Sequence, residues 1–191
     1  TAPFPQGGNP FAGQSQPNNG RLVIAQIDDF TVSHGHRIED VLESGGNDPN
    51  LRGSIDVLKY NVGQNGSAPT RRIGDALQDV ANRIRGGQQI NAVNLSMEDF
   101  QVSGESARVR ALIDQIQAMG VPVSVAAGNS GPNAQNQLAT AGAFVVQSTN
   151  QFGQVNPSSG LGNESAASQT TSFAAANLAP VLAALHAQGA S

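Results

Sequence analysis

Short apolar runs alternate with segments of helical periodicity along most of this chain, and this alternation restricts the fold more than any other feature. The runs that read as buried strands are 22–27, 54–60, 90–96, 121–126 and 143–146. The segments whose apolar residues recur at helical spacing are 35–44, 70–85, 104–119 and 172–186. Strands that alternate with helices predict an α/β fold, in which a mostly parallel sheet is covered by helices on both faces to give three layers.

The chain has 191 residues, enough for a single domain with a proper core. Residues 1–20 are rich in Pro, Gly, Asn and Gln, which predicts a flexible N-terminal segment followed by one folded domain over 21–191. This segment lacks the charged start and apolar stretch of a signal peptide. We therefore expect that any targeting segment has already been removed or never existed.

Composition excludes several classes of function. The net charge is −4 and no Lys/Arg cluster is present, so we expect no nucleic-acid partner. No run approaches the roughly 20 apolar residues of a membrane span, so we expect no membrane partner. The absence of cysteine excludes disulfides, thiol nucleophiles and Cys-ligated metals. With three histidines and no acidic loop of calcium-binding pattern, we expect neither a catalytic metal nor a cofactor, and structural calcium is not predicted.

Polar residues stand where the predicted strands end. Asp28 ends the first strand, Ser96 ends the third, and Asn129 follows the fourth. Ligands of parallel sheets gather at the carboxyl ends of the strands, so we expect these side chains to converge. Ser172 opens the last helix, where backbone N–H groups and the helix dipole favour a nucleophile and an oxyanion. Taken singly, Ser172 reads as a helix cap and Asn129 as a turn residue.

In chain order these residues and one histidine are Asp28, His34, Asn129 and Ser172. A carboxylate that orients a histidine, a histidine that deprotonates a serine and an amide that donates to the oxyanion are the parts of acyl-transfer machinery. Asp29 is an alternative to Asp28, and His36 is an alternative to His34. The third histidine, near the end of the last helix, is expected to interact with the helix C-terminus.

Five segments in register resemble the subtilisin-like serine proteases (subtilases), from about residue 22 to the end of the chain. They are Val23–Asp28, Ser33-His34-Gly35, Asn94-Leu95-Ser96-Met97, Ala126-Ala127-Gly128-Asn129 and Thr171-Ser172-Phe173-Ala174. They resemble, in turn, the family's catalytic-Asp strand, catalytic-His segment, substrate-binding strand, oxyanion strand and nucleophile motif. The Asp, His, Ser order is also that of subtilisin.

The resemblance implies a role for each matching residue. Asp28 would orient His34, which would take the proton of Ser172 and return it to the leaving amine. The side-chain amide of Asn129 and the backbone N–H of Ser172 would bind the oxyanion. The substrate-binding residues would be Ser96, Met97, Glu98 and Gly128. The backbone of Ser96–Glu98 would pair with an extended substrate as an added strand.

The chain also departs from the family pattern. Only five residues separate Asp28 from His34, where family members have tens. Thr170 replaces a glycine before the nucleophile motif, and the family's helix proline is shifted to Pro180. Glu98 and Asp99 stand where the family has glycines lining its primary pocket. Their charge suggests the hypothesis of a preference for basic side chains.

These observations predict a subtilisin-like serine endopeptidase that forms an acyl-enzyme, acts as a monomer and takes a protein or peptide substrate. The alternative is an inactive, subtilase-like peptide-binding module. Other serine hydrolases would need a Gly-x-Ser-x-Gly elbow, which does not surround Ser172. Since cysteine-free subtilases are typically secreted by bacteria, we expect a secreted bacterial protein; delivery into another cell is the alternative.

Overall fold

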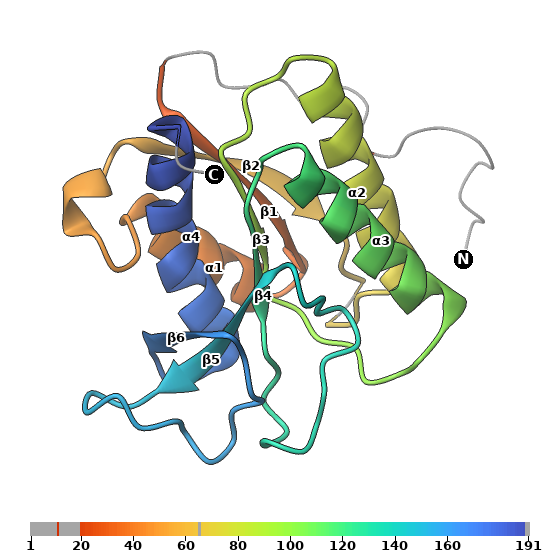
Figure 1. Ribbon diagram of the computed structural model, residues 1–191, viewed down its shortest axis with the longest axis vertical. Coiled ribbons are helices and arrows are strands. Elements are labelled where there is room, and N and C mark those ends of the chain that lie inside the picture. The colour runs from red at the N-terminus through yellow and green to blue at the C-terminus, as the bar shows by residue number, and fades with distance from the viewer. Residues whose placement is uncertain (1–10, 12–19, 65, 190–191) are drawn as a thin grey trace.

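A six-stranded sheet forms the centre of the computed structural model, which describes residues 11, 20–64 and 66–189 (Figure 1). The strands lie in the order β2-β1-β3-β4-β5-β6, and every pair of neighbours is parallel. The strands are β1 (Leu22–Asp28), β2 (Ile55–Asn61), β3 (Ala92–Leu95), β4 (Val123–Ala126), β5 (Phe144–Thr149) and β6 (Glu164–Ala167). All four residues of β3 and of β4 are buried, as expected for central strands covered on both faces.

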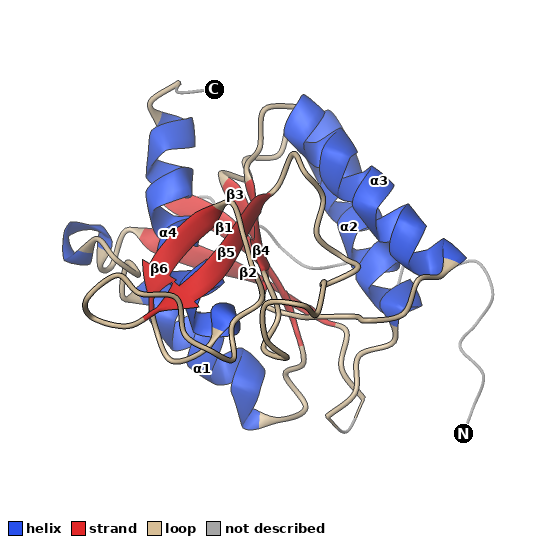
Figure 2. Ribbon diagram, turned by 60° about the horizontal axis from the view of Figure 1, so that its bottom comes forward, coloured by secondary structure: helices blue, strands red, loops and turns tan. Residues whose placement is uncertain are grey.

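Helices cover both faces of the sheet. They are α1 (Ser33–Glu43), α2 (Thr70–Arg85), α3 (Gly104–Ala118) and α4 (Thr171–Ala187), with a short 3₁₀ turn, η1, over Pro49–Leu51. Figures 1 and 2 show α1 and α4 on one face and α2 and α3 on the other. The predicted three-layer α/β architecture is therefore confirmed.

The two faces of the sheet have different cores. Under α2 and α3 lies the larger apolar cluster, built mainly from Ile, Leu, Val and Ala side chains of the sheet and of these two helices. Under α1 and α4 the core is smaller and rich in alanine, including Ala176, Ala179 and Ala183 of α4. Because alanine is small, α4 can lie close across the sheet, and its first turn is brought to the ends of the central strands.

Strand register sets the level of the polar residues at the carboxyl edge of the sheet. Ile27 of β1 pairs with Leu95 of β3, so Asp28 and Ser96, one residue further on, lie at the same level. Leu95 in turn pairs with Val125 of β4. The ends of three adjacent strands therefore meet at one place, as the sequence predicts.

The sequence predicted the four main helices and five of the six strands. It missed β6, whose residues Glu-Ser-Ala-Ala are mostly exposed at the sheet edge and carry no apolar alternation. Most of the predicted flexible segment 1–20 lies outside the described residues. Its Phe11, however, is buried and packs edge-on against Tyr60 with ring centroids 5.0 Å apart, a core contact that the composition of the segment did not predict.

No helix in the described part of the chain is both long and apolar enough to cross a membrane.

A buried polar cluster lies within the core: the hydroxyl of Tyr60 donates to Asp79 at 2.8 Å, and Arg83 donates to the same carboxylate oxygen at 2.6 Å. Burial raises the pKa of Tyr60, so it remains protonated and continues to donate.

Candidate active site

Asp28 and His34 form a hydrogen-bonded pair at the carboxyl edge of the sheet. Asp28 ends β1 and is fully buried, whereas His34 lies in the first turn of α1 with its side chain 39% exposed. Nδ1 of His34 lies 2.9 Å from Oδ1 of Asp28. This bond raises the pKa of His34 above its ordinary value, although partial burial acts in the opposite direction. The histidine can therefore hold a proton that it receives, with its other ring nitrogen left for chemistry.

The structure separates these residues from their alternatives. Asp29 has no hydrogen bond to a histidine among the described residues; its carboxylate accepts hydrogen bonds from the backbone N–H and the hydroxyl of Thr31. His36 is exposed and lies 3.5 Å from Glu39 on the same helix. Of the two carboxylate–imidazole pairs in the described part of the chain, Asp28 with His34 is the one at the end of a central strand.

Gln26 holds the short connection between Asp28 and His34. Its amide nitrogen donates to the carbonyl of Gly35 at 2.7 Å and approaches Oδ2 of Asp28 at 3.4 Å. Gly35 is itself held close to β1, because its N–H donates to the carbonyl of Asp29 at 3.2 Å. A Cβ on Gly35 would lie 2.8 Å from that carbonyl oxygen, so this approach requires glycine. The sequence did not point to Gln26, because its role depends on how α1 folds back onto β1.

Ser172 lies in the first turn of α4, which begins one residue earlier than predicted, and the serine is 7% exposed. It forms a reciprocal pair with Ser96: the hydroxyl of Ser172 donates to the carbonyl of Ser96 at 3.2 Å, and the hydroxyl of Ser96 donates to the carbonyl of Ser172 at 2.8 Å. Among the described residues Ser172 has no hydrogen bond to His34. The imidazole lies instead beside the next residue, Phe173, with ring centroids 6.4 Å apart.

Asn129 is oriented by the residue that precedes Ser172. Its Oδ1 accepts hydrogen bonds from the backbone N–H of Thr171 at 2.9 Å and from the Thr171 hydroxyl at 3.1 Å. The N–H of Gly128 donates to the same hydroxyl oxygen at 3.1 Å. With its oxygen occupied in this way, the amide of Asn129 has its nitrogen left as a donor beside the start of α4. Thr171 thus ties Asn129 to the helix that carries Ser172.

The segment that follows β3 is hydrogen-bonded to Asn136, in the loop between β4 and β5. Asn136 is buried, and its amide nitrogen donates to the carbonyls of Met97 at 2.9 Å and Ala126 at 2.8 Å. Its oxygen accepts from the N–H groups of Asp99 at 3.0 Å and Leu138 at 3.1 Å. Asn136 therefore clamps the ends of β3 and β4 together. Sequence reasoning missed it, since an asparagine in a loop carries no distinguishing pattern.

Glu98 reaches across to the segment that follows β4. Its Oε2 accepts a hydrogen bond from the backbone N–H of Asn129 at 2.8 Å and lies 3.1 Å from the position that a Cβ on Gly128 would occupy. The predicted substrate-binding residues Ser96, Met97, Glu98 and Gly128 therefore lie in one region. The backbone N–H and C=O of Glu98 form no hydrogen bond within the described residues, which leaves both groups open to an added strand.

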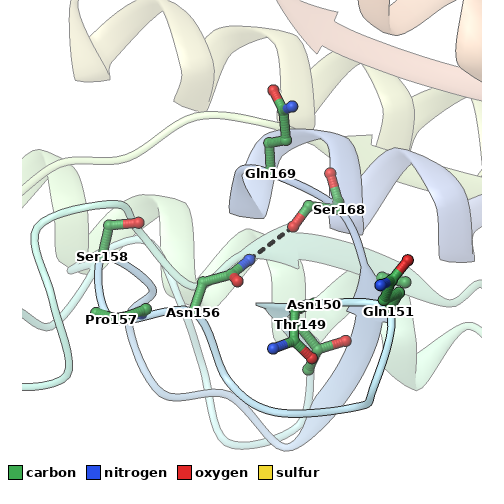
Figure 3. Close-up of a pocket in the computed structure, with 9 residues that line it drawn as sticks. Thr149, Asn150, Gln151, Asn156, Pro157, Ser158, Ser168 and Gln169 are labelled. Atoms are coloured by element: carbon green, nitrogen blue, oxygen red, sulfur yellow. Dashed lines mark hydrogen bonds between the residues drawn. The ribbon is translucent and has the colours of Figure 1, made fainter.

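A cavity of about 500 Å³ opens between the end of β5 and the segment that leads into α4 (Figure 3). Its lining residues are neutral, mainly amides and hydroxyls, and Asn156 donates across it to the carbonyl of Ser168 at 2.7 Å. Because no lining residue titrates near neutral pH, the cavity supplies no acid or base of its own. No group of three His, Asp or Glu side chains within the described ranges is arranged to hold a metal ion.

Comparison with solved structures identifies the architecture. A protease that matures prenylagaramide, PagA, superposes with a TM-score of 0.70 at 16% identity, over 87% of this chain and 75% of the other. A lanthipeptide protease superposes with a TM-score of 0.70 at 15% identity, over 86% and 73% of the two chains. A cold-adapted subtilisin-like serine proteinase gives 0.67 at 18% identity, over 94% and 84%. The fold is subtilisin-like.

No protein-family model matches the sequence, and neither does any curated protein. The subtilisin-like fold is thus visible in the arrangement of helices and strands, while the sequence has diverged to identities of 13–18% among the neighbours. The resemblance seen in five short motifs is confirmed at the level of the fold. The roles of the individual residues stay predictions.

Proposed function

We propose that this protein is a serine endopeptidase that hydrolyses peptide bonds through an acyl-enzyme on Ser172. The observation that carries the proposal is the hydrogen-bonded Asp28–His34 pair, which lies at the same edge of a subtilisin-like fold as the first turn of α4. Several of the similar structures are named as proteases, and PagA is named as a peptide-maturation protease, which supports a peptide substrate for the present chain.

In the proposed reaction Ser172 Oγ attacks the scissile carbonyl carbon while Nε2 of His34 takes its proton. Asp28 holds the imidazole through Nδ1 and stabilises its cationic form. The C–N bond then breaks, the leaving amine takes the proton from His34, and an ester of Ser172 remains. Water attacks this ester with His34 as the base, and the carboxylic acid product leaves as the serine hydroxyl is restored.

This reaction needs the hydroxyl of Ser172 to change its hydrogen-bond partner. Its hydroxyl must turn from the carbonyl of Ser96 to His34, which gives up one hydrogen bond worth about 1 kcal/mol. An arriving substrate N–H can replace the serine hydroxyl on that carbonyl, so substrate binding itself favours the rotation. Hydrogen bonds between nucleophile and base are often long or absent before substrate binds.

Two donors lie ready for the oxyanion in the proposal: the amide nitrogen of Asn129 and the backbone N–H of Ser172. The orientation of Asn129 follows from the two Thr171 donors that occupy its oxygen. The N–H of Ser172 belongs to the first turn of α4, where backbone donors have no partner within the helix. Both donors are in position before the reaction begins, which is what electrostatic stabilisation of a transition state requires.

The proposal is tested by incubating the protein with a proteome-derived peptide library and identifying new termini by mass spectrometry. Such a library samples most local sequences, so a narrow specificity does not hide the activity. We expect cleavages with the native chain and none with Ser172→Ala or His34→Ala; Ser130→Ala, which changes an exposed serine next to Asn129, is the matched control. Peptides that are retained but never cut would identify the inactive peptide-binding module instead.

We further propose, from the family resemblance, that this cysteine-free chain is secreted by a bacterium and acts as a monomer without a cofactor. Fractionation of producing cells tests the secretion, and sedimentation of the purified protein tests the monomeric state.

A further inference from the structure

We propose that Glu98 and Phe100 form a recognition site for a cationic side chain, so that the substrate residue that contributes the scissile carbonyl is Arg or Lys. This inference rests on the proposed function, because it names the substrate class for the same site. It depends on four features of the described residues: an unpaired carboxylate, an exposed aromatic ring, a rigid support and the position of all three relative to Ser172.

The carboxylate of Glu98 has a hydrogen-bond partner but no counter-ion. One oxygen, Oε2, accepts from the N–H of Asn129, while Oε1 has no partner among the described residues. None of the ion pairs in the described part of the chain includes Glu98. The negative charge is therefore held at a defined place with one oxygen free, as a cationic ligand requires.

The aromatic ring of Phe100 lies on the same glycine as this carboxylate. A Cβ on Gly128 would lie 3.1 Å from Oε2 of Glu98 and 3.7 Å from Cε1 of Phe100. Phe100 is 45% exposed, so part of its ring is accessible to a ligand. An exposed ring beside a carboxylate suits Arg and Lys, because the ring packs against the aliphatic stem and attracts the cation.

The support of the site is rigid. Asn136 holds the backbone on both sides of Glu98, through the carbonyl of Met97 and the N–H of Asp99. The carbonyl of Asp99 also accepts from the N–H of Gln137 at 2.6 Å. The neighbouring acid, Asp99, is already engaged, since its oxygens accept from Thr70 and from the N–H of Gln101. Glu98 is therefore the carboxylate left for a ligand in this segment.

Position relative to Ser172 defines which substrate residue enters the site. The carbonyl oxygen of Ser96 lies 3.2 Å from Oγ of Ser172. When the scissile carbonyl carbon is bonded to this Oγ, the backbone N–H of the same substrate residue lies next to the Ser96 carbonyl. The oxygen of the scissile carbonyl then points to Asn129. The side chain of that residue must lie between the two segments that carry these groups, which is where Glu98 and Phe100 meet over Gly128.

The test uses Ser172→Ala as the parent, so that peptides bind without being cut. Two dye-labelled peptides, Ala-Ala-Ala-Arg amide and the same peptide with citrulline for Arg, are titrated by fluorescence anisotropy at low salt. Citrulline keeps the shape of arginine and lacks its charge. We expect the Arg peptide to bind about tenfold more tightly, or about 1.4 kcal/mol. This preference should disappear when Glu98→Gln is added and should weaken in high salt.

Glu43→Gln, at the far end of α1 from His34, removes another exposed carboxylate and should leave the preference intact. Equal affinities for the two peptides, an equal effect of Glu43→Gln, or no binding of either peptide would overturn the inference. Labelling of the native chain by a fluorophosphonate probe is measured in parallel and reports only on the reactive serine. Labelling without an Arg preference refutes the inference and supports the proposed endopeptidase. An Arg preference without labelling supports the cationic site and refutes the proposed endopeptidase.

Discussion

The Asn136 clamp provides the most quantitative prediction. The side chain is 2% exposed and makes four hydrogen bonds, to Met97, Ala126, Asp99 and Leu138. At a net value of about 1 kcal/mol for each bond, Asn136→Ala should lower the free energy of unfolding by about 4 kcal/mol. That is a large share of the roughly 5–15 kcal/mol by which domains of this kind are stable. For a chain of this length the melting temperature should fall by about 8–16 °C.

Urea denaturation, monitored by circular dichroism, measures this loss of unfolding free energy. If the slope of that free energy against urea concentration is the same in the native chain and the variant, the folded and unfolded states have not changed. Asn156→Ala is the matched control, because Asn156 is half-buried and its side chain donates two hydrogen bonds, to Ser148 and Ser168. It should cost about 2 kcal/mol. If Asn136→Ala cost less than about 1 kcal/mol, or no more than Asn156→Ala, the clamp would not be holding the strand ends together.

Two further predictions concern the chemistry. Because His34 must be neutral to accept a proton and its pKa is raised by Asp28, the rate of fluorophosphonate labelling should rise with pH through a midpoint above 6.5. Asp28→Asn should move that midpoint to lower pH as well as slow the reaction, and an unmoved midpoint would contradict the assignment. Asn129→Asp keeps an oxygen for both Thr171 donors, so the free energy of unfolding should change by less than about 1 kcal/mol. Labelling should nevertheless slow by about 10²–10³, a magnitude taken from the asparagine donor of subtilisin, and an unchanged rate would remove Asn129 from the oxyanion site.

The fold could be predicted from the sequence because its signals are local. Apolar runs of strand length and helical periodicity lie within single elements, and they placed all four main helices and five strands. The strand β6 was missed because its four residues are short, polar and mostly exposed, so that only pairing with β5 identifies it. Phe11 was missed for a similar reason: one aromatic residue in a Pro/Gly-rich segment gives no sign that it will pack on Tyr60.

The candidate site could be predicted only in part. Asp28, Ser96 and Asn129 were found because each follows an apolar strand, and register then brings these positions to one edge. Side chains that act across the sheet could not be found in this way. Gln26 and Asn136 work by donating to backbone carbonyls of other elements, and such bonds depend on tertiary approach rather than on spacing along the chain. The hydrogen bond of Glu98 to the N–H of Asn129 is of the same kind.

The central claim is that Ser172 is an activated nucleophile, and its most direct test is the site of covalent modification. The native protein is treated with a fluorophosphonate, and the modified residue is identified by peptide mapping and mass spectrometry. The account predicts a single adduct, carried by the hydroxyl of Ser172, that does not form in His34→Ala. A folded native protein that forms no adduct, or an adduct on a different serine, would contradict the account.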